Sequence, residues 1–129
     1  VISTLHSLGA ENTVDRIIDI FPPSQQQQIR IQLSQLLSCI ISQQLIPCED
    51  GLLRPAFEIM KCNNAIRNMI RESKTHQINS MIQTSKKLGM QTMDDCILGY
   101  YNQGLISPEI AVRYAHDPIG MANRVHLYY

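Results

Sequence analysis

The chain has 129 residues, of which 44% are hydrophobic and 17% charged, and its eleven basic side chains balance eleven acidic ones. This composition is typical of one ordinary globular domain and excludes a disordered chain. Zero net charge, without a basic patch interleaved with aromatic residues, disfavours direct nucleic-acid binding. Because no apolar run is long enough to span a bilayer and no signal-peptide pattern opens the chain, we expect a cytoplasmic protein.

The first five residues have the pattern of a strand that needs neighbours on both sides. The chain opens without methionine or a start signal, so we expect it to be truncated. An apolar repeat at i, i+3, i+4 and i+7 then predicts an amphipathic helix that two prolines, at 22 and 23, bring to an end. The repeat consists of Val14, Ile17, Ile18 and Phe21.

Ser24 and Gln27 have the spacing of a capping box for the next helix. The apolar stripe of that helix is formed by Ile29, Leu33, Leu36, Leu37 and Ile40. Two strand-like runs, residues 40–46 and 53–60, then flank a turn signal at residues 49–51 and predict a hairpin. Pro55 indicates that the second strand lies near an edge, because proline cannot donate to a ladder.

From residue 63 onward the pattern is helical. Asn63 or Asn64 can cap a first helix, and Ser73 a second one that ends at Gly89. We expect Ile78, Met81 and Ile82 to face inward from the second helix.

Two more helices are predicted near the C-terminus. Thr92 and Asp95 form a capping-box pattern for a helix that stops at Gly104. Ser107 followed by proline starts the other, and the Asp117-Pro118 pair is predicted to end it. The last dozen residues lack a clear period, so we expect them to be loosely held.

Four cysteines are scattered without a Cys-x-x-Cys pair or a histidine at ligand spacing. Zinc sites need such spacings, so we expect free thiols rather than a metal site. The four are Cys39, Cys48, Cys62 and Cys96.

The first candidate functional residues are Thr4 and His6. Open α/β sheets place ligand contacts at the carboxyl ends of strands, where this histidine is expected to lie. Its ring nitrogens can donate to a phosphate oxygen and so register a terminal phosphate. The alternative is an ordinary hydrogen-bonded histidine.

The second candidate is the helix of residues 65–72. Its apolar side consists of Ala65, Ile66, Met69 and Ile70, and its polar side of Arg67, Asn68, Arg71 and Glu72. Two arginines one turn apart are suited to bidentate pairing with carboxylates on a moving neighbour. The alternative is a plain amphipathic surface helix.

These motifs resemble those of the type IV pilus retraction ATPases (the PilT type). Residues 65–72 are similar to the AIRNLIRE signature, with Met69 in place of leucine, and residues 1–10 to the histidine box VISTLHTNSA. The chain departs from that box at residues 7–9, Ser-Leu-Gly in place of Thr-Asn-Ser, which puts a polar role of these positions in doubt. Further similar stretches, in order along the chain up to about Ala115, are residues 15–22, 41–45, 57–60, 74–78 and 89–94.

The resemblance implies a predominantly α fragment of a RecA-like α/β P-loop NTPase core, with one hairpin and a C-terminal helical bundle. Residues 1–62 would complete the core, residues 63–116 would form the bundle that carries the motif, and residues 117–129 a tail. The resemblance also implies that Thr4 and His6 contact the terminal phosphate and that the motif of residues 65–72 is needed for retraction rather than for nucleotide binding.

The P-loop lysine motif that phosphoryl transfer needs does not occur here, because no Gly-x-x-x-x-Gly is followed by lysine. In the family this element and the Walker B acidic residue lie upstream of the histidine, as does a PAS-like domain. The chain is therefore expected to be inactive alone and to bind no cofactor by itself. The full-length protein would use ATP and Mg²⁺.

The leading hypothesis is the C-terminal segment of a hexameric, ATP-driven retraction motor. It would lie at the cytoplasmic face of the inner membrane, peripheral to it, and couple nucleotide state to work on the membrane platform protein of the pilus. The alternative is a stand-alone, non-catalytic helical interaction module derived from a secretion ATPase. A relative that drives pilus extension or secretion is disfavoured by the arginine signature.

Overall fold

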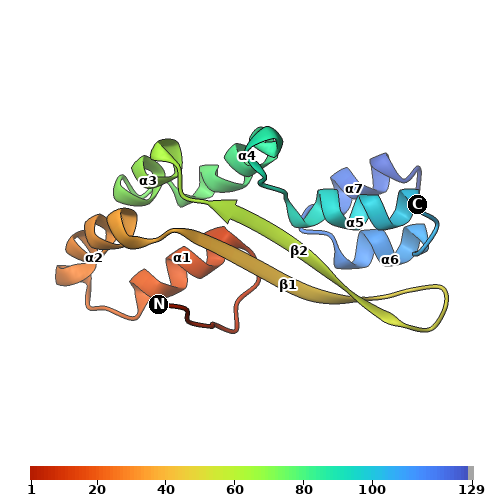
Figure 1. Ribbon diagram of the computed structural model, residues 1–129, viewed down its shortest axis with the longest axis horizontal. Helices are drawn as coiled ribbons and strands as arrows, with labels where there is room; N and C mark the ends of the chain where they lie inside the picture. Colours follow the sequence, from red (N-terminus) through yellow and green to blue (C-terminus); the bar gives the residue numbers. More distant parts are fainter. Residues whose placement is uncertain (128–129) are drawn as a thin grey trace.

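The computed structural model describes residues 1–127, in which helices pack along one long antiparallel hairpin (Figure 1). The elements in chain order are α1 (Ala10–Asp19), α2 (Pro23–Leu36), β1 (Cys39–Pro47), β2 (Leu53–Lys61), α3 (Asn64–Arg71), η1 (Thr75–Gln77), α4 (Ile78–Gln83), η2 (Lys86–Leu88), α5 (Met93–Asn102), α6 (Pro108–Tyr114) and α7 (Pro118–Arg124). The expectation of a mostly helical chain with one hairpin is confirmed. None of the helices in these residues has the length and apolar character needed to cross a membrane.

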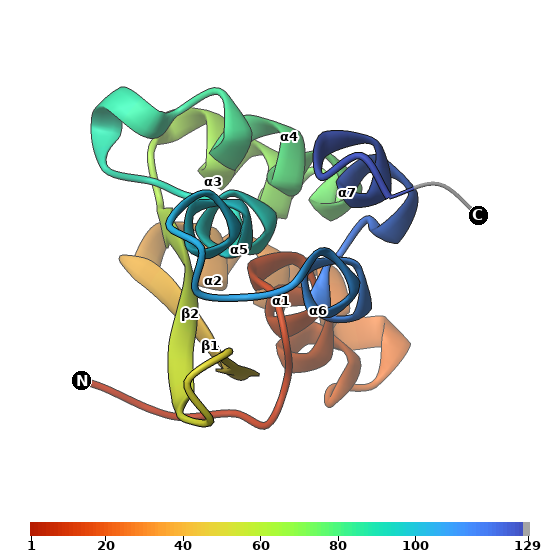
Figure 2. The same cartoon turned by 90° about the vertical axis from the view of Figure 1, so that its right-hand side faces the viewer.

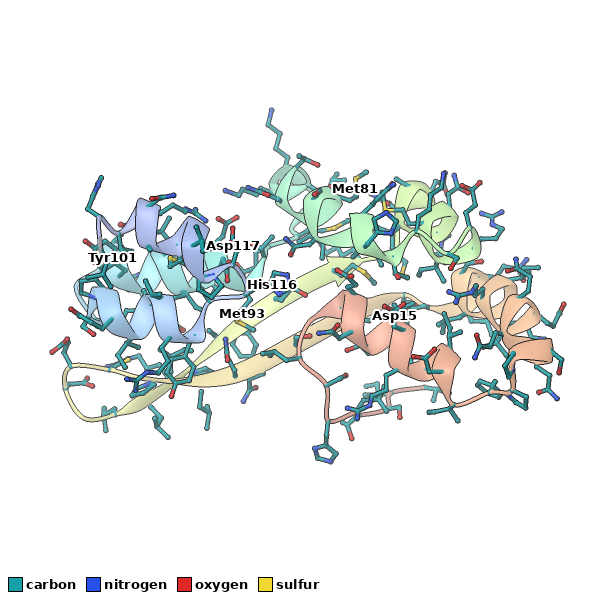
Figure 3. All side chains as sticks on the ribbon, turned by 180° about the vertical axis from the view of Figure 1, so that it is seen from behind. Asp15, Met81, Met93, Tyr101, His116 and Asp117 are labelled. Atoms are coloured by element: carbon teal, nitrogen blue, oxygen red, sulfur yellow. The ribbon has the colours of Figure 1, made fainter. Side chains whose placement is uncertain are left out.

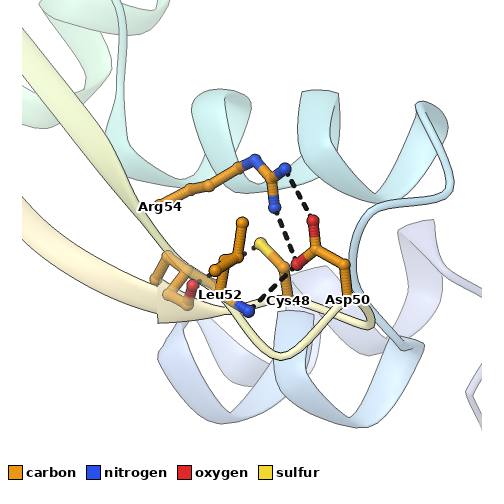
Figure 4. A network of polar contacts seen from close by, with 5 residues as sticks. Cys48, Asp50, Leu52 and Arg54 are labelled. Carbon is orange, nitrogen blue, oxygen red and sulfur yellow. Dashed lines mark hydrogen bonds and ion pairs between the residues drawn. The ribbon is translucent and has the colours of Figure 1, made fainter.

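The hairpin consists of two strands with alternating buried and exposed side chains, joined by a turn that side-chain hydrogen bonds stabilise. β1 and β2 pair from Cys39 opposite Lys61 to Pro47 opposite Leu53. At the tip, Asp50 accepts two hydrogen bonds from Arg54, at 3.0 and 2.7 Å, and one from the Leu52 N–H at 3.0 Å (Figure 4). The hydrogen bond from Arg54 holds the pKa of the Asp50 carboxyl below its usual value.

The two faces of the hairpin differ strongly in exposure. Ile46, Ala56 and Met60 on the inward face are fully buried. On the outward face Ile41 and Leu53 are 62% and 60% exposed. This division follows from the two-residue period of a strand, which sends alternate side chains to opposite faces.

The buried side chains form two apolar clusters along the inward face. The first contains Ala10, Val14, Ile18, Met60, Ile66, Ile70, Ile78, Ile82 and Met90. The second contains Ile46, Cys48, Ala56, Met93, Ile97, Ile106, Ala111, Met121 and Val125. Helices α1 to α4 therefore surround the open end of the hairpin, and α5 to α7 cover the end that carries the turn (Figures 1 and 2).

Three inward-facing polar side chains separate the two clusters: Ser42, Gln44 and Glu58. Gln44 donates from Nε2 to the Tyr114 carbonyl at 2.9 Å and so fastens the end of α6 to β1. Ser42 and Glu58 accept backbone N–H groups, as described below.

Several predicted helix boundaries are confirmed by side-chain caps. Asn63 accepts from the Ile66 N–H, Thr92 from the Asp95 N–H and Ser107 from the Ile110 N–H. Each of these residues thereby satisfies one of the free N–H groups at a helix start.

The predicted opening strand is wrong. Residues 1–9 have no regular secondary structure, and Val1 and Ile2 are almost fully exposed. A strand needs a partner for its backbone, and the sheet of the described residues consists of β1 and β2 alone.

Two predicted caps are also wrong. Ser24 lies inside α2, which starts at Pro23 and has no side-chain cap; proline suits the first helical position, since it lacks an N–H and presets φ. Ser73 closes α3 in the left-handed conformation instead of starting the next helix. The Ser73 N–H donates to the Ile70 carbonyl and the Lys74 N–H to the Met69 carbonyl, the hydrogen-bond pattern of a Schellman motif.

The expected apolar stripe of α2 is only partly correct. Ile29, Leu33 and Leu37 pack against the first cluster, but Leu36 is 79% exposed. Ile40 lies in β1, because the helix ends at Leu36.

The C-terminal region is better ordered than predicted. α6 ends at Tyr114, and Asp117 starts α7 by accepting from the Gly120 N–H at 3.1 Å. Met121 and Val125 are almost fully buried in the second cluster, so the prediction that the last dozen residues are loosely held is wrong for residues 118–125. Of the predicted tail, Tyr128 and Tyr129 lie outside the described residues.

Asp94 and Asp95, at the start of α5, connect α5 to the residues around α7. Asp94 accepts from the His116 and Asp117 N–H groups, residues labelled in Figure 3. Asp95 pairs with Arg124 at 2.8 Å and with Lys86 at 3.2 Å. Burial by itself raises the pKa of Asp95, but the hydrogen bonds from Arg124 and Lys86 outweigh it and lower the pKa.

We expect Asp95→Asn to lower the free energy of unfolding by about 1 kcal/mol near pH 7, a typical value for a partly exposed ion pair. A carboxyl whose pKa is lower in the folded state stabilises the protein above its unfolded-state pKa of about 4. The difference between the two proteins should therefore be constant above about pH 5 and decrease as the pH falls below the unfolded-state pKa and through the lower folded-state pKa. Urea unfolding at several pH values measures it, and an undiminished difference at pH 3 would contradict the ion pairs.

Candidate functional site

The segment that carries the two candidate phosphate contacts lies directly before α1. Thr4 and His6 are both exposed. The His6 carbonyl accepts a hydrogen bond from Arg16 Nη1 at 3.0 Å, which ties the segment to α1 and leaves the imidazole available. An exposed imidazole and a hydroxyl two residues apart can donate to an oxyanion such as a phosphate.

The C-terminal side of this segment is anchored by several hydrogen bonds. Ser7 and Thr13 are joined through their hydroxyls at 2.8 Å, and Asn12 Nδ2 donates to the Leu8 carbonyl at 2.9 Å. The Gly9 N–H donates to Ser42 Oγ at 3.1 Å. The backbone between His6 and α1 is thus positioned by both α1 and β1.

Gly9 has a conformation that favours glycine. Its φ is +90° at the position just before α1, and an added Cβ would lie 3.6 Å from Glu58 Oε2. The space would admit a Cβ, but the backbone would be strained with any other side chain. The departure of the sequence from the histidine box at this position is therefore matched by a local backbone geometry that suits glycine.

A small cleft lies between the start of α1, α4 and the connection between α6 and α7. Polar side chains of Asn12, Glu58, Asn79 and His116 line it, next to Ile78 and Ile82. Its volume is about 20 Å³, which is enough for one or two water molecules and too small for a nucleotide. The cleft therefore does not serve as a nucleotide pocket within these residues.

The predicted motif helix is α3, which packs against α2. Ile66 and Ile70 are fully buried, Ala65 and Met69 are half-buried, and Asn68, Arg71 and Glu72 are exposed. The helix therefore docks by its apolar side, as its pattern predicts.

The two arginines of α3 have different surroundings. Arg67 Nη1 donates to the Ser34 carbonyl at 2.6 Å and to the Leu37 carbonyl at 3.1 Å. These carbonyls lie at the C-terminal end of α2, where helix carbonyls lack partners and the helix dipole favours a cation. Arg71 stays on the surface and donates to Asn68 Oδ1 at 2.7 Å. The expected face with two available guanidinium groups is therefore reduced to Arg71.

Cys62 lies between β2 and α3 and is half-buried. Burial raises the pKa of its thiol, although the charge of Arg67 acts in the opposite direction. Cys62 is therefore a neutral thiol at neutral pH. The four cysteines of the chain are free.

The structure does not bring the histidine segment and α3 together. Figures 1 and 2 place the first residues below α1, and α3 above it, in both views. The elements between them are α1 and the hairpin.

The polar residues in the middle of the hairpin were missed by the sequence analysis. Ser42 and Glu58 occupy inward-facing positions in strands whose other inward positions are mostly apolar, and they are 5% and 6% exposed. A polar residue in register with buried apolar ones is a signal that the sequence contains. The alternation of the strands predicts the hairpin, but it does not reveal which groups these buried polar side chains bind.

Comparisons with known proteins find relatives over nearly the whole chain. A twitching motility protein of Neisseria gonorrhoeae is 47% identical over 123 residues, which are 95% of this chain and 33% of that protein. The type IV pilus retraction ATPase PilT of Pseudomonas aeruginosa is 46% identical over 118 residues, 92% of this chain and 34% of that protein. The chain thus spans about one third of the length of these relatives. No family model matches it.

Comparison with solved structures also finds a pilus retraction motor. The pilus retraction motor PilT with bound ADP matches 90% of this chain and 32% of its own, at 44% identity and a TM-score of 0.79. The ATPase DotB of Legionella pneumophila matches 82% of the chain at 20% identity and a TM-score of 0.66, which shows a shared fold alone.

The different roles of the two arginines can be measured as stability. Arg67→Ala should lower the free energy of unfolding by about 2 kcal/mol, because it removes charge-assisted hydrogen bonds from partly buried carbonyls. Arg71→Ala should change it by no more than about 0.5 kcal/mol, as for most surface substitutions. Urea unfolding of both variants gives the comparison, and equal losses would contradict a stabilising role of the hydrogen bonds from Arg67 to the C-terminal end of α2.

Proposed function

We propose that this chain works as the force-coupling segment of an ATP-driven retraction motor of type IV pili, because it is homologous to a segment that makes up about one third of the length of pilus retraction ATPases. The observation that carries this proposal is the match of 90% of the chain to the retraction motor at 44% identity and a TM-score of 0.79. The ATP-binding elements would be supplied by polypeptide outside these 129 residues.

The residues of this chain fit a phosphate contact and do not fit a complete ATP site. Thr4 and His6 are exposed and carry donors suited to a terminal phosphate. The phosphate-binding loop with its lysine, which cradles the phosphates and helps to bind Mg²⁺ in P-loop NTPases, does not occur in this sequence, so that part of the site would come from elsewhere in the motor. When bound, ATP supplies the free energy of phosphoryl transfer, and this segment senses whether the terminal phosphate is present.

The coupling role is assigned to α3. Arg67 fastens the helix to the end of α2, so that α2 and α3 can move as one body. Arg71 is exposed near the end of that body and can pair with a carboxylate of a neighbouring subunit or of the membrane platform protein. We assign the assembled motor a hexameric state and a position at the cytoplasmic face of the inner membrane, as the family resemblance implies.

The outward face of the hairpin supports a role inside a larger assembly. Ile41, Leu45 and Leu53 expose about half or more of their surface. Exposed apolar side chains that share one face of a hairpin are consistent with a surface that packs against another protein.

We expect Arg71→Ala in the assembled motor to abolish pilus retraction and to leave ATP binding unchanged. The physical reason is the loss of the exposed guanidinium from a helix that otherwise keeps its packing. Arg113→Ala, which removes an exposed arginine from the last turn of α6, is the matched control. Twitching motility and nucleotide titration are the measurements. Normal twitching in Arg71→Ala, or in a double variant that also replaces Arg67, would refute the coupling role.

A second experiment tests the division of labour between this chain and the rest of the motor. We expect isothermal titration of the purified chain with ATP and Mg²⁺ to give no measurable heat, because a single exposed histidine segment lacks a phosphate-binding loop. Hydrolysis of ATP by the purified chain would overturn the proposal.

A further inference from the structure

Ser42 and Glu58 form a buried polar pair in the middle of the hairpin. They are partners in the strand register and lie between the two apolar clusters. A polar side chain buried to this degree is stable only with hydrogen-bond partners. The identity of those partners indicates what the pair does.

All the partners are backbone N–H groups at the starts of helices. Ser42 Oγ accepts from the Gly9 N–H at 3.1 Å and Glu58 Oε2 from the Ala10 N–H at 2.7 Å, both at the start of α1. Glu58 Oε1 accepts from the Met93 N–H at 3.4 Å, at the start of α5. Helix N-termini carry free N–H groups and a positive partial charge, so a buried carboxylate between two of them is well stabilised.

This pair determines where the histidine segment can lie. Gly9 and Ala10 follow His6 by three and four residues, so the register of α1 on the hairpin sets the starting point of the segment. The other oxygen of Glu58 connects the same point to α5 and the C-terminal helices. A displacement of the segment would have to break these hydrogen bonds or move the hairpin with it.

We propose that Ser42 and Glu58 are positioning residues, which hold the His6 segment at one register on the hairpin so that its imidazole can meet a terminal phosphate. This inference rests on the proposed function for the role of His6. It goes beyond that function because it places the control of the phosphate contact in the hairpin, away from the residues of both motifs.

Hydrogen exchange of the 129-residue chain tests the positioning directly. Ser42→Ala should make exchange of the Gly9 N–H about tenfold faster, the effect expected for the loss of one buried hydrogen bond. Glu58→Gln keeps the shape but has one acceptor oxygen for two N–H groups, so it should accelerate exchange of the Ala10 N–H or the Met93 N–H. Ser42→Thr keeps the hydroxyl and should restore slow exchange at Gly9.

Ser85→Ala is the matched control for Ser42→Ala. Ser85 is buried to the same degree, and its hydroxyl donates to the Met81 carbonyl at 2.7 Å, within its own segment. Its removal should leave exchange at Gly9 and Ala10 unchanged. Unchanged exchange at Gly9 in Ser42→Ala, or equal acceleration in Ser85→Ala, would overturn the proposal.

Nucleotide discrimination by the assembled motor provides a measurement that a general loss of stability would not alter. His6→Ala should reduce the ratio of ATP to ADP affinity by about tenfold, because it removes a hydrogen bond to a charged group that only ATP offers. Ser42→Ala should shift the ratio in the same direction, with ADP affinity retained, and Ser42→Thr should restore it.

The two proposals fail in different ways. If His6→Ala leaves the ratio unchanged, the phosphate contact is wrong, and hydrogen exchange still shows whether Ser42 holds the segment. If His6→Ala lowers the ratio and Ser42→Ala does not, the phosphate contact stands and the positioning role is wrong.

Discussion

The structure depends on a hairpin whose buried face is apolar at both ends and polar in the middle. A two-stranded sheet is at best marginally stable by itself, so the helices that cover it supply most of the stabilisation. Helices α1 to α4 pack on one apolar end and α5 to α7 on the other, and the polar middle lies where these two groups of helices meet. Glu58 is bound there by the first turns of α1 and α5, one helix from each group. Without this carboxylate, both groups of helices would still pack on the hairpin, but no buried side chain among the described residues would accept hydrogen bonds from α1 and α5 at the same time.

Local signals predicted the parts of the fold that local interactions determine. The turn at residues 49–51 and the caps at Asn63, Thr92 and Ser107 each involve residues within a few positions of one another, and each is present as expected. The motif helix was predicted from its amphipathic pattern, and its apolar side is the side that packs. For such elements the chemistry that selects the structure lies within the same stretch of sequence.

The predictions that failed concern contacts between distant residues. The opening strand has a strand-like composition, but the described chain offers its backbone no partner. The helix α7 has only seven residues and little periodicity, and it is held by burial of Met121 and by the Asp94 and Asp95 contacts to the residues around it. The polar pair of the hairpin shows the same limit. An inward polar residue can be recognised in the sequence, but its partners 33 to 48 positions away cannot.

The motif helix shows how one pattern can hold two roles. The helical period places Arg67 and Arg71 on the same side of α3, which suggests equal exposure. The neighbouring helix α2 makes the two exposures differ. It ends beside Arg67, which donates to carbonyls that have no partner within the helix. A cation that satisfies them joins two helices rigidly, and a joined pair transmits displacement better than a single helix on a flexible connection. The arginine that remains exposed can then act on another surface from a fixed base. In the proposed coupling role, the hydrogen bonds of Arg67 to α2 are a precondition for the action of Arg71.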